Sequence, residues 1–93
     1  MQIHIEHQPD QHRFVLTQDS ESAAFSEYFD DATSRNFYHT VTLPQYRGRG
    51  LAAVLTEHAL DDALEHGLSV IPSCWFVREF IETNPDKYGR LLQ

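Results

Sequence analysis

Basic residues are scarce in this chain of 93 residues. Seven Lys and Arg stand against fourteen Asp and Glu, which gives a formal net charge of −7 at pH 7. Nucleic acids and anionic membranes attract basic surfaces, so this balance argues against either as a general partner. Any anion that the protein binds must therefore be held by a small local group of residues.

Cysteine and long apolar segments are scarce as well. The single cysteine, Cys74, has no second thiol with which to form an intramolecular disulfide. The N-terminal residues "MQIHIEHQPD" lack the uninterrupted apolar stretch of a signal peptide, and no segment reaches the length of a membrane-spanning helix. These absences predict a cytoplasmic protein in a reducing environment.

Apolar residues, by contrast, are plentiful enough for a folded core. Hydrophobic residues make up 41% of the chain and aromatic residues 12%, a composition typical of globular proteins. A chain of this size buries roughly two-thirds of its unfolded surface and cannot supply two independent cores. We therefore expect one domain over residues 1–93.

The first half of the chain alternates apolar and polar residues, which predicts strands. The four predicted strands cover residues 2–7, 12–17, 22–30 and 37–43. The fourth strand has the clearest two-residue period. That period predicts that four side chains share one face: Phe37, His39, Val41 and Leu43.

The second half changes to a helical period. An amphipathic helix is predicted from about residue 50 to residue 66, with Gly67 as its left-handed cap. A short apolar strand over residues 68–72 should pair in parallel with the fourth strand, as in a β-α-β unit. Ser73 is expected to cap a last helix over residues 74–84.

This order of elements predicts a compact α+β domain: an antiparallel four-strand meander, one β-α-β crossover and a C-terminal helix. The last residues of the chain are expected to form a turn and a tail.

The turn before the first predicted helix gathers two of the few arginines. It reads "QYRGRGLA" over residues 45–52. A helix N-terminus offers unpaired N–H groups, Gly48 and Gly50 allow close approach to the backbone, and Arg47 and Arg49 can bind phosphate oxygens. Alternatively, a strand-to-helix turn simply tolerates glycine and leaves its arginines solvated. Spacing alone keeps both interpretations open.

The same turn resembles the acetyl-CoA pyrophosphate loop of the GNAT N-acetyltransferases, whose pattern is Gln or Arg, two residues, Gly, one residue, Gly or Ala. Gln45, Gly48 and Gly50 match the three specified positions. With "VIPSCWFV" and "NPDKY", the chain further resembles small stand-alone GNAT-like proteins that carry little beyond the core of the fold.

That resemblance implies a minimal GNAT fold whose fourth and fifth strands splay apart, with acetyl-CoA as the cofactor. The pantetheine arm would lie along the fourth strand and the pyrophosphate on the loop. Larger family members form the acceptor pocket with early helices for which this chain has no room. The acceptor site would then be open, or completed by a protein partner or a second copy of the chain. The expected cofactor residues are Val41, Leu43, Gln45, Arg47, Gly48, Arg49, Gly50, Leu51, Ala52 and Asn84.

Cys74 and His39 are the candidates for catalysis. If Ser73 caps the last helix, Cys74 lies in its first turn, where the helix dipole favours a thiolate nucleophile or a proton donor to the leaving group. It could equally be a small buried apolar side chain. His39 could be a base beside the thioester or a core histidine with a satisfied hydrogen bond.

Other polar residues give weaker signals. His58, Asp62 and His66 fall on one helical stripe, but a solvated face explains them and we expect no metal. Tyr88 resembles the general acid of larger relatives, although its spacing favours a packing role.

We therefore predict an acetyl-CoA-dependent N-acyltransferase that acetylates an unidentified amine. The alternative is an acetyl-CoA-binding or protein-interaction module on the same fold without catalysis. An RNA-binding interpretation of "RGRG" is disfavoured by the acidic composition and the lack of a stacking-aromatic signature.

Overall fold

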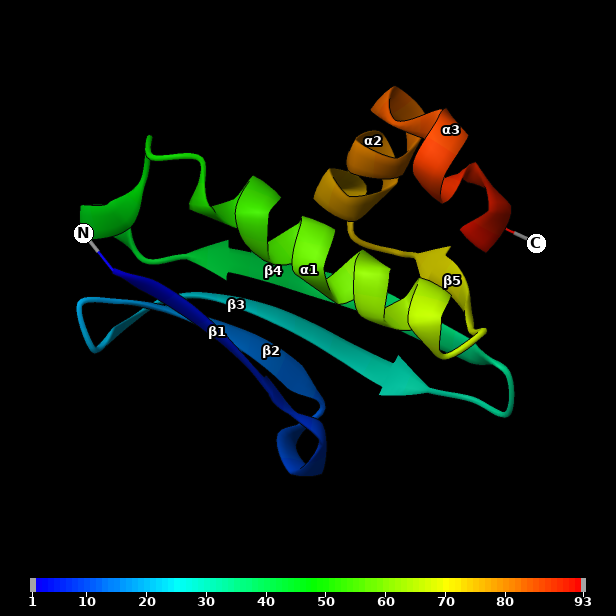
Figure 1. The fold of residues 1–93 in the computed structure, drawn as a ribbon, viewed down its shortest axis with the longest axis horizontal. Coiled ribbons are helices and arrows are strands. Elements are labelled where there is room, and N and C mark those ends of the chain that lie inside the picture. Colours follow the sequence, from blue (N-terminus) through cyan, green and yellow to red (C-terminus); the bar gives the residue numbers. More distant parts are fainter. Residues whose placement is uncertain (1, 93) are drawn as a thin grey trace.

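The computed structural model describes residues 2–92, which form one five-stranded sheet with helices packed against it (Figure 1). The strands are β1 (Ile3–Gln8), β2 (Arg13–Gln18), β3 (Glu21–Asp30), β4 (Ser34–Thr42) and β5 (Ser69–Pro72). The helices are α1 (Leu51–Glu65), α2 (Trp75–Thr83) and α3 (Pro85–Tyr88), with short 3-10 turns at Pro9–Gln11, Pro44–Tyr46 and Gly89–Leu91.

The strands lie in sequence order across the sheet. β1 to β4 pair antiparallel, and β5 pairs in parallel with β4 after the crossover through α1. Figure 1 shows α1 running across the sheet, with α2 and α3 near its β5 end. The α+β class, the meander and the crossover are thus confirmed.

One core joins α1, α2 and the C-terminal turns to a single face of the sheet. Phe14, Leu16 and Phe37 from the strands meet Leu55 and Leu60 from α1, and all five side chains are almost fully buried. We call the opposite side of the sheet the open face. No helix of the described chain covers it, and side chains such as Phe29 and Tyr38 are about half exposed there.

A β-bulge interrupts the pairing of β3 with β4. Glu27 pairs with His39 and Tyr28 with Phe37, so Tyr38 is an extra residue without a partner in β3. Phe37 is 1% exposed, whereas Tyr38 and His39 are both exposed. The prediction that Phe37 and His39 share a face is therefore wrong, because a bulge shifts the alternation by one residue.

The pairing of β4 with β5 stops early. It runs from Ser34 opposite Ser69 to Phe37 opposite Pro72, and the Cys74 amide donates a last 2.9 Å bond to the Phe37 carbonyl. Beyond that point β4 continues to Thr42 beside β3 alone. β5 ends at Pro72, so β4 has no β5 neighbour from Tyr38 onward.

The ends of the helices differ in part from expectation. Gly67 has φ 67° after α1, as predicted for a left-handed cap. Ser73 does not cap α2: the N-cap is Cys74, with extended backbone, and α2 begins at Trp75. The predicted tail also folds, because α3 and the following turn bury Tyr88 and Leu91 in the core.

Candidate functional site

The basic loop is built around two glycines in the left-handed region. Gly48 has φ 82° and Gly50, the N-cap of α1, has φ 73°, conformations that other residues rarely adopt. The first turn of α1 contains no acidic residue. Its leading N–H groups have no partner within the helix, so they can meet an anion.

The two loop arginines are exposed, and each makes a single weak contact within the protein. Arg47 donates from Nε to the Thr42 carbonyl at 3.3 Å, and the Arg49 guanidinium lies 5.5 Å from the centre of the Tyr46 ring. Neither forms a salt bridge within residues 2–92. Their charges therefore remain available to a ligand.

Two adjoining cavities extend from this loop to Cys74. The loop cavity has a volume of about 220 Å³ and the Cys74 cavity about 340 Å³, and both are open to solvent. Because they share lining residues, we treat them as one groove between α1, α2 and β4, the cofactor groove. The shared residues are Thr42, Arg47, Ala52 and Phe76.

The open edge of β4 borders this groove. The Leu43 amide donates to the Ala23 carbonyl in β3, whereas the Thr42 carbonyl accepts from Arg47 on the other side. Backbone groups alternate along a strand, so Thr40 and Thr42 direct theirs to the open edge. Of the two β4 residues that the sequence indicated, Val41 lines the Cys74 cavity and the Leu43 amide is paired with β3.

Cys74 lies on the wall of the cofactor groove at the point where the strands part. Its Sγ donates to Thr40 Oγ1 at 3.5 Å, and the side chain is half-buried. As the N-cap it precedes the first turn of α2 rather than lying within it. Trp75 beside it is 70% exposed and lines the same cavity. Nothing in the sequence distinguished Trp75 from a core aromatic residue.

His39 lies on the open face, away from Cys74. Its Nδ1 is 2.7 Å from Glu27 Oε1, and its side chain is 53% exposed. The interpretation of His39 as a core histidine is therefore wrong. A cavity of about 260 Å³ lies beside it, and Val41 lines both this cavity and the cofactor groove.

The other predicted cofactor residues are placed as follows. Leu51 and Ala52 begin α1 at the loop cavity, and Gln45 is exposed in the preceding 3-10 turn. Asn84 donates from Nδ2 to the Phe80 carbonyl at 2.8 Å, which closes the end of α2. Asn84 is not among the residues that line the two cavities of the groove.

Tyr88 has a packing role. It is 1% exposed, and its hydroxyl donates to Asp61 Oδ1 at 2.8 Å. Burial, together with this hydrogen bond to a carboxylate, raises the pKa of Tyr88 to about 12. The contact holds the C-terminal segment against α1.

Of the predicted polar stripe of α1, Asp62 joins a charge network around the buried Arg35, whereas His58 and His66 are exposed. Arg35 donates to Asp62 at 3.0 Å and to Asp30 at 2.8 Å, and its guanidinium lies 4.1 Å from the centre of the Tyr28 ring. His66 bonds through Nδ1 to the Asp62 carbonyl. Within residues 2–92 no group of side chains has the arrangement of a metal site.

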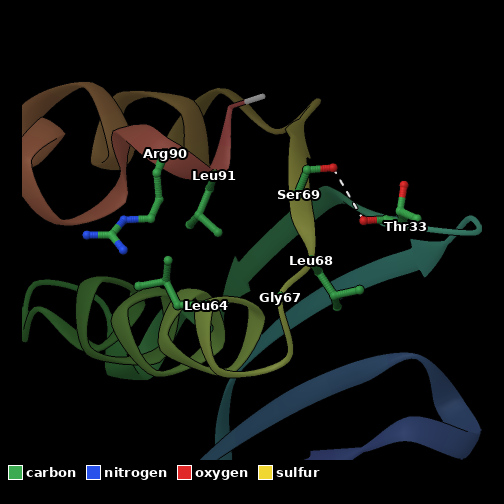
Figure 2. A pocket seen from close by; sticks show the side chains of 7 residues that line it. All are labelled: Thr33, Leu64, Gly67, Leu68, Ser69, Arg90 and Leu91. Atoms are coloured by element: carbon green, nitrogen blue, oxygen red, sulfur yellow. Dashed lines mark hydrogen bonds between the residues drawn. The ribbon is translucent and has the colours of Figure 1, made fainter.

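A further cavity, of about 410 Å³, lies at the C-terminal end of α1 (Figure 2). Leu64, Leu68 and Leu91 supply its apolar lining, and Arg90 extends from the C-terminal turn above α1. None of the predicted catalytic or cofactor residues lines it. In the part of the chain described, no helix is long and apolar enough to span a membrane.

Comparison with known proteins places these features in a family. The family described as GCN5-related N-acetyl-transferase matches residues 13–91. Protein NATD1 of Bos taurus is 40% identical over 47 residues and that of Homo sapiens 38%. Each match covers 50% of this chain but only 42% of the relative, so the chain spans less than half the length of these curated proteins.

Two solved structures share the fold. A GCN5-like protein from Staphylococcus aureus, determined by NMR, has a TM-score of 0.70 at 26% identity, over 92% of this chain and 83% of that protein. The ribosomal-protein-S18-alanine N-acetyltransferase from Escherichia coli has a TM-score of 0.60 at 27% identity, over 62% of this chain and 38% of that enzyme. Because the family match spans well over half of the chain, this protein belongs to the GCN5-related N-acetyltransferase family.

Proposed function

We propose that the protein transfers the acetyl group of acetyl-CoA to an amine. One observation carries the proposal: a continuous groove joins a basic helix N-terminus to the point where β4 and β5 part, beside Cys74. A groove of this kind suits a long ligand with an anionic end and an amide-containing arm.

The residues present fit acetyl-CoA. The N–H groups at the start of α1, with Arg47 and Arg49, would hold the pyrophosphate through charge-assisted hydrogen bonds. The backbone of Thr40 and Thr42 on the open edge of β4 would bind the pantetheine amides, as an added strand binds a sheet edge. When bound, acetyl-CoA supplies an acetyl thioester activated for attack by an amine.

Cys74 then lies where the reacting end of that arm would be. Its thiol could protonate the departing thiolate or accept the acetyl group first. The hydrogen bond from Sγ to Thr40 fixes the thiol toward β4 in both cases. We further propose a cytoplasmic location, which follows from the single cysteine.

The competing proposal is a module that binds acetyl-CoA without transferring the acetyl group. It is favoured because few structural elements are present to form a pocket for the acceptor. β2 and β3 join directly through a tight turn at Asp19 and Ser20, with φ 51° and 72°. No helix lies between these strands to shape an acceptor pocket. A protein partner or a second copy of the chain would then complete the site.

Titration with acetyl-CoA followed by mass spectrometry of the intact protein tests both proposals. We expect saturable binding, and an acetyl adduct on Cys74 if the thiol acts as nucleophile. A screen of amines and peptides should then give multiple turnovers that fall at least tenfold in Cys74→Ala, while acetyl-CoA binding persists. Binding without turnover for any acceptor would favour the module, and absence of binding would refute both proposals.

A further inference from the structure

The open face carries an ordered row of polar side chains across four strands. The registers place Gln8 opposite Arg13, Arg13 opposite Glu27, and Glu27 opposite His39. Arg13 is held by the Gln8 oxygen at 2.7 Å and lies 5.1 Å from the centre of the Phe25 ring. Glu27 bonds instead to His39, at the β4 end of the row.

The contact between Glu27 and His39 fixes how the imidazole is protonated. An ionised carboxylate can only accept, so Nδ1 donates its hydrogen to Glu27 Oε1 at 2.7 Å. In the neutral ring the lone pair is then on Nε2. The Tyr38 ring lies nearly parallel to the imidazole, with ring centroids 6.5 Å apart. The hydrogen bond to Glu27 thus orients the imidazole and leaves Nε2 as its acceptor nitrogen.

The end of β5 at Pro72 leaves the edge of β4 open between this base and the cofactor groove. His39 and Thr40 are consecutive on β4 and point to opposite faces, and Thr40 accepts the hydrogen bond from Cys74. At these residues β4 has no pairing with β5, because the last residue of β4 that pairs with β5 is Phe37. Val41 lines the cavity on each side. A molecule on the open face can therefore reach past the edge of β4 toward the groove.

We infer that Glu27 is a positioning residue that holds His39 as the base for the acceptor amine, which approaches the thioester from the open face of the sheet. The inference rests on the transfer reaction proposed above. It adds the side of entry and a carboxylate that the sequence did not single out.

The chemistry balances with groups already named. The acceptor ammonium gives one proton to His39 Nε2, and the freed lone pair forms the C–N bond at the thioester carbon. The C–S bond then breaks, the nitrogen loses its second proton, and the CoA thiolate takes up one proton to leave as a thiol. His39 releases its proton to solvent through its exposed side. The net products are the amide, the thiol and one proton.

The net charge of the chain favours a cationic acceptor, while Arg13 and Glu27 carry opposite charges and offset each other locally. Arg13 and Glu27 line the open-face cavity with His39, and the whole chain carries −7. The remaining lining residues, Phe25 and Val41, are apolar and suit the aliphatic chain of an alkyl amine or a lysine. The acceptor class is therefore a primary alkyl ammonium, free or on a peptide.

A double-mutant cycle tests the inference, with butylamine and a lysine-containing peptide as probes. His39→Ala should lower kcat by about a hundredfold, and Glu27→Ala by about tenfold, with the KM for acetyl-CoA unchanged. Glu27→Gln retains an oxygen that accepts the Nδ1 hydrogen, so it should recover most of the lost kcat. Glu6→Gln, on the same open face but opposite Val15, is the matched control and should leave kcat unchanged.

The cycle distinguishes positioning from a general structural role. In the His39→Ala background, Glu27→Ala should have no further effect on kcat, because Glu27 acts only through His39. Nitrogen-15 NMR should also show the Nδ1-protonated ring in the wild type and its loss in Glu27→Ala. Additive effects, or an unchanged ring in Glu27→Ala, would overturn the inference while the transfer reaction stands. A wild type that binds acetyl-CoA but acetylates no amine would instead refute the proposed function.

Discussion

The two ends of α1 use arginine in opposite ways. Near its C-terminal end, Arg35 is 7% exposed and bonded to Asp30 and Asp62. At its N-terminal end, Arg47 and Arg49 are exposed and make no salt bridge in the described structure. In the first region charge is neutralised by other side chains and stabilises the fold. In the second, charge and helix N–H groups remain available to a ligand.

Loss of the Arg35 charge should give the largest effect. Arg35→Met keeps much of the aliphatic volume but leaves Asp30 and Asp62 without their partner, and Asp62 is only 19% exposed. Breaking a buried ion pair of this kind costs about 3–5 kcal/mol. We expect a loss near 3 kcal/mol in the free energy of unfolding, measured by urea denaturation. A loss below 1 kcal/mol would show that the two regions do not differ in this way.

Loss of the loop arginines should affect binding and not folding. The double variant Arg47→Ala and Arg49→Ala removes two hydrogen-bond donors to a charged group, each with a typical worth of about 1.5 kcal/mol or more. Calorimetry should show acetyl-CoA affinity reduced by one to two orders of magnitude. The free energy of unfolding should change by less than about 0.5 kcal/mol.

The matched control for the loop variant is Arg90→Ala, an exposed arginine at the far cavity. It should leave acetyl-CoA affinity unchanged. Equal losses of affinity in the two variants would mean that the anion is attracted by the positive charge of any exposed arginine and is not bound specifically by the loop.

The smallest effect concerns pH. Burial lowers the pKa of His7 below 6.5; Asp62 partly offsets this, and Arg35 lowers the pKa further. The His7 ring stacks on Phe14, and Nε2 lies 2.5 Å from the Tyr28 hydroxyl, within hydrogen-bond distance. The unfolded chain binds the proton more readily, so stability should be complete above pH 6.5 and decline as pH falls below it.

Urea denaturation at pH 7.5 and pH 5.5 measures this dependence. His7→Gln should show less decline between the two pH values than the wild type. The pKa of Asp30 is lowered by its bond to Arg35, so its contribution is lost only below about pH 4 and does not affect this window. A wild type no less stable at pH 5.5 than at pH 7.5 would contradict the assignment.

Local patterns predicted most of the fold. Alternation located the strands to within a few residues, the change of period located α1, and Gly67 marked its end. The C-terminal segment was missed because a four-residue helix is too short to show a period, and its stability comes from Tyr88 and Leu91 packing into the core.

The sequence predicted the loop of the candidate site but not its other residues, for a similar reason. The loop is a contiguous motif, so its glycines and arginines could be read directly from the chain. Three other site residues could not be read from the chain, because their positions depend on the tertiary structure. Thr40 contacts Cys74, Glu27 contacts His39, and Trp75 lines the cofactor groove.

The sequence by itself determined the α+β order of elements and the basic loop before α1, because both depend on neighbouring residues. Only the tertiary structure decided which face His39 occupies and which backbone groups of β4 remain free. One extra residue, Tyr38, sets the face of His39. A bulge depends on how two strands pair with each other, and the alternation of residues within one strand does not specify that pairing.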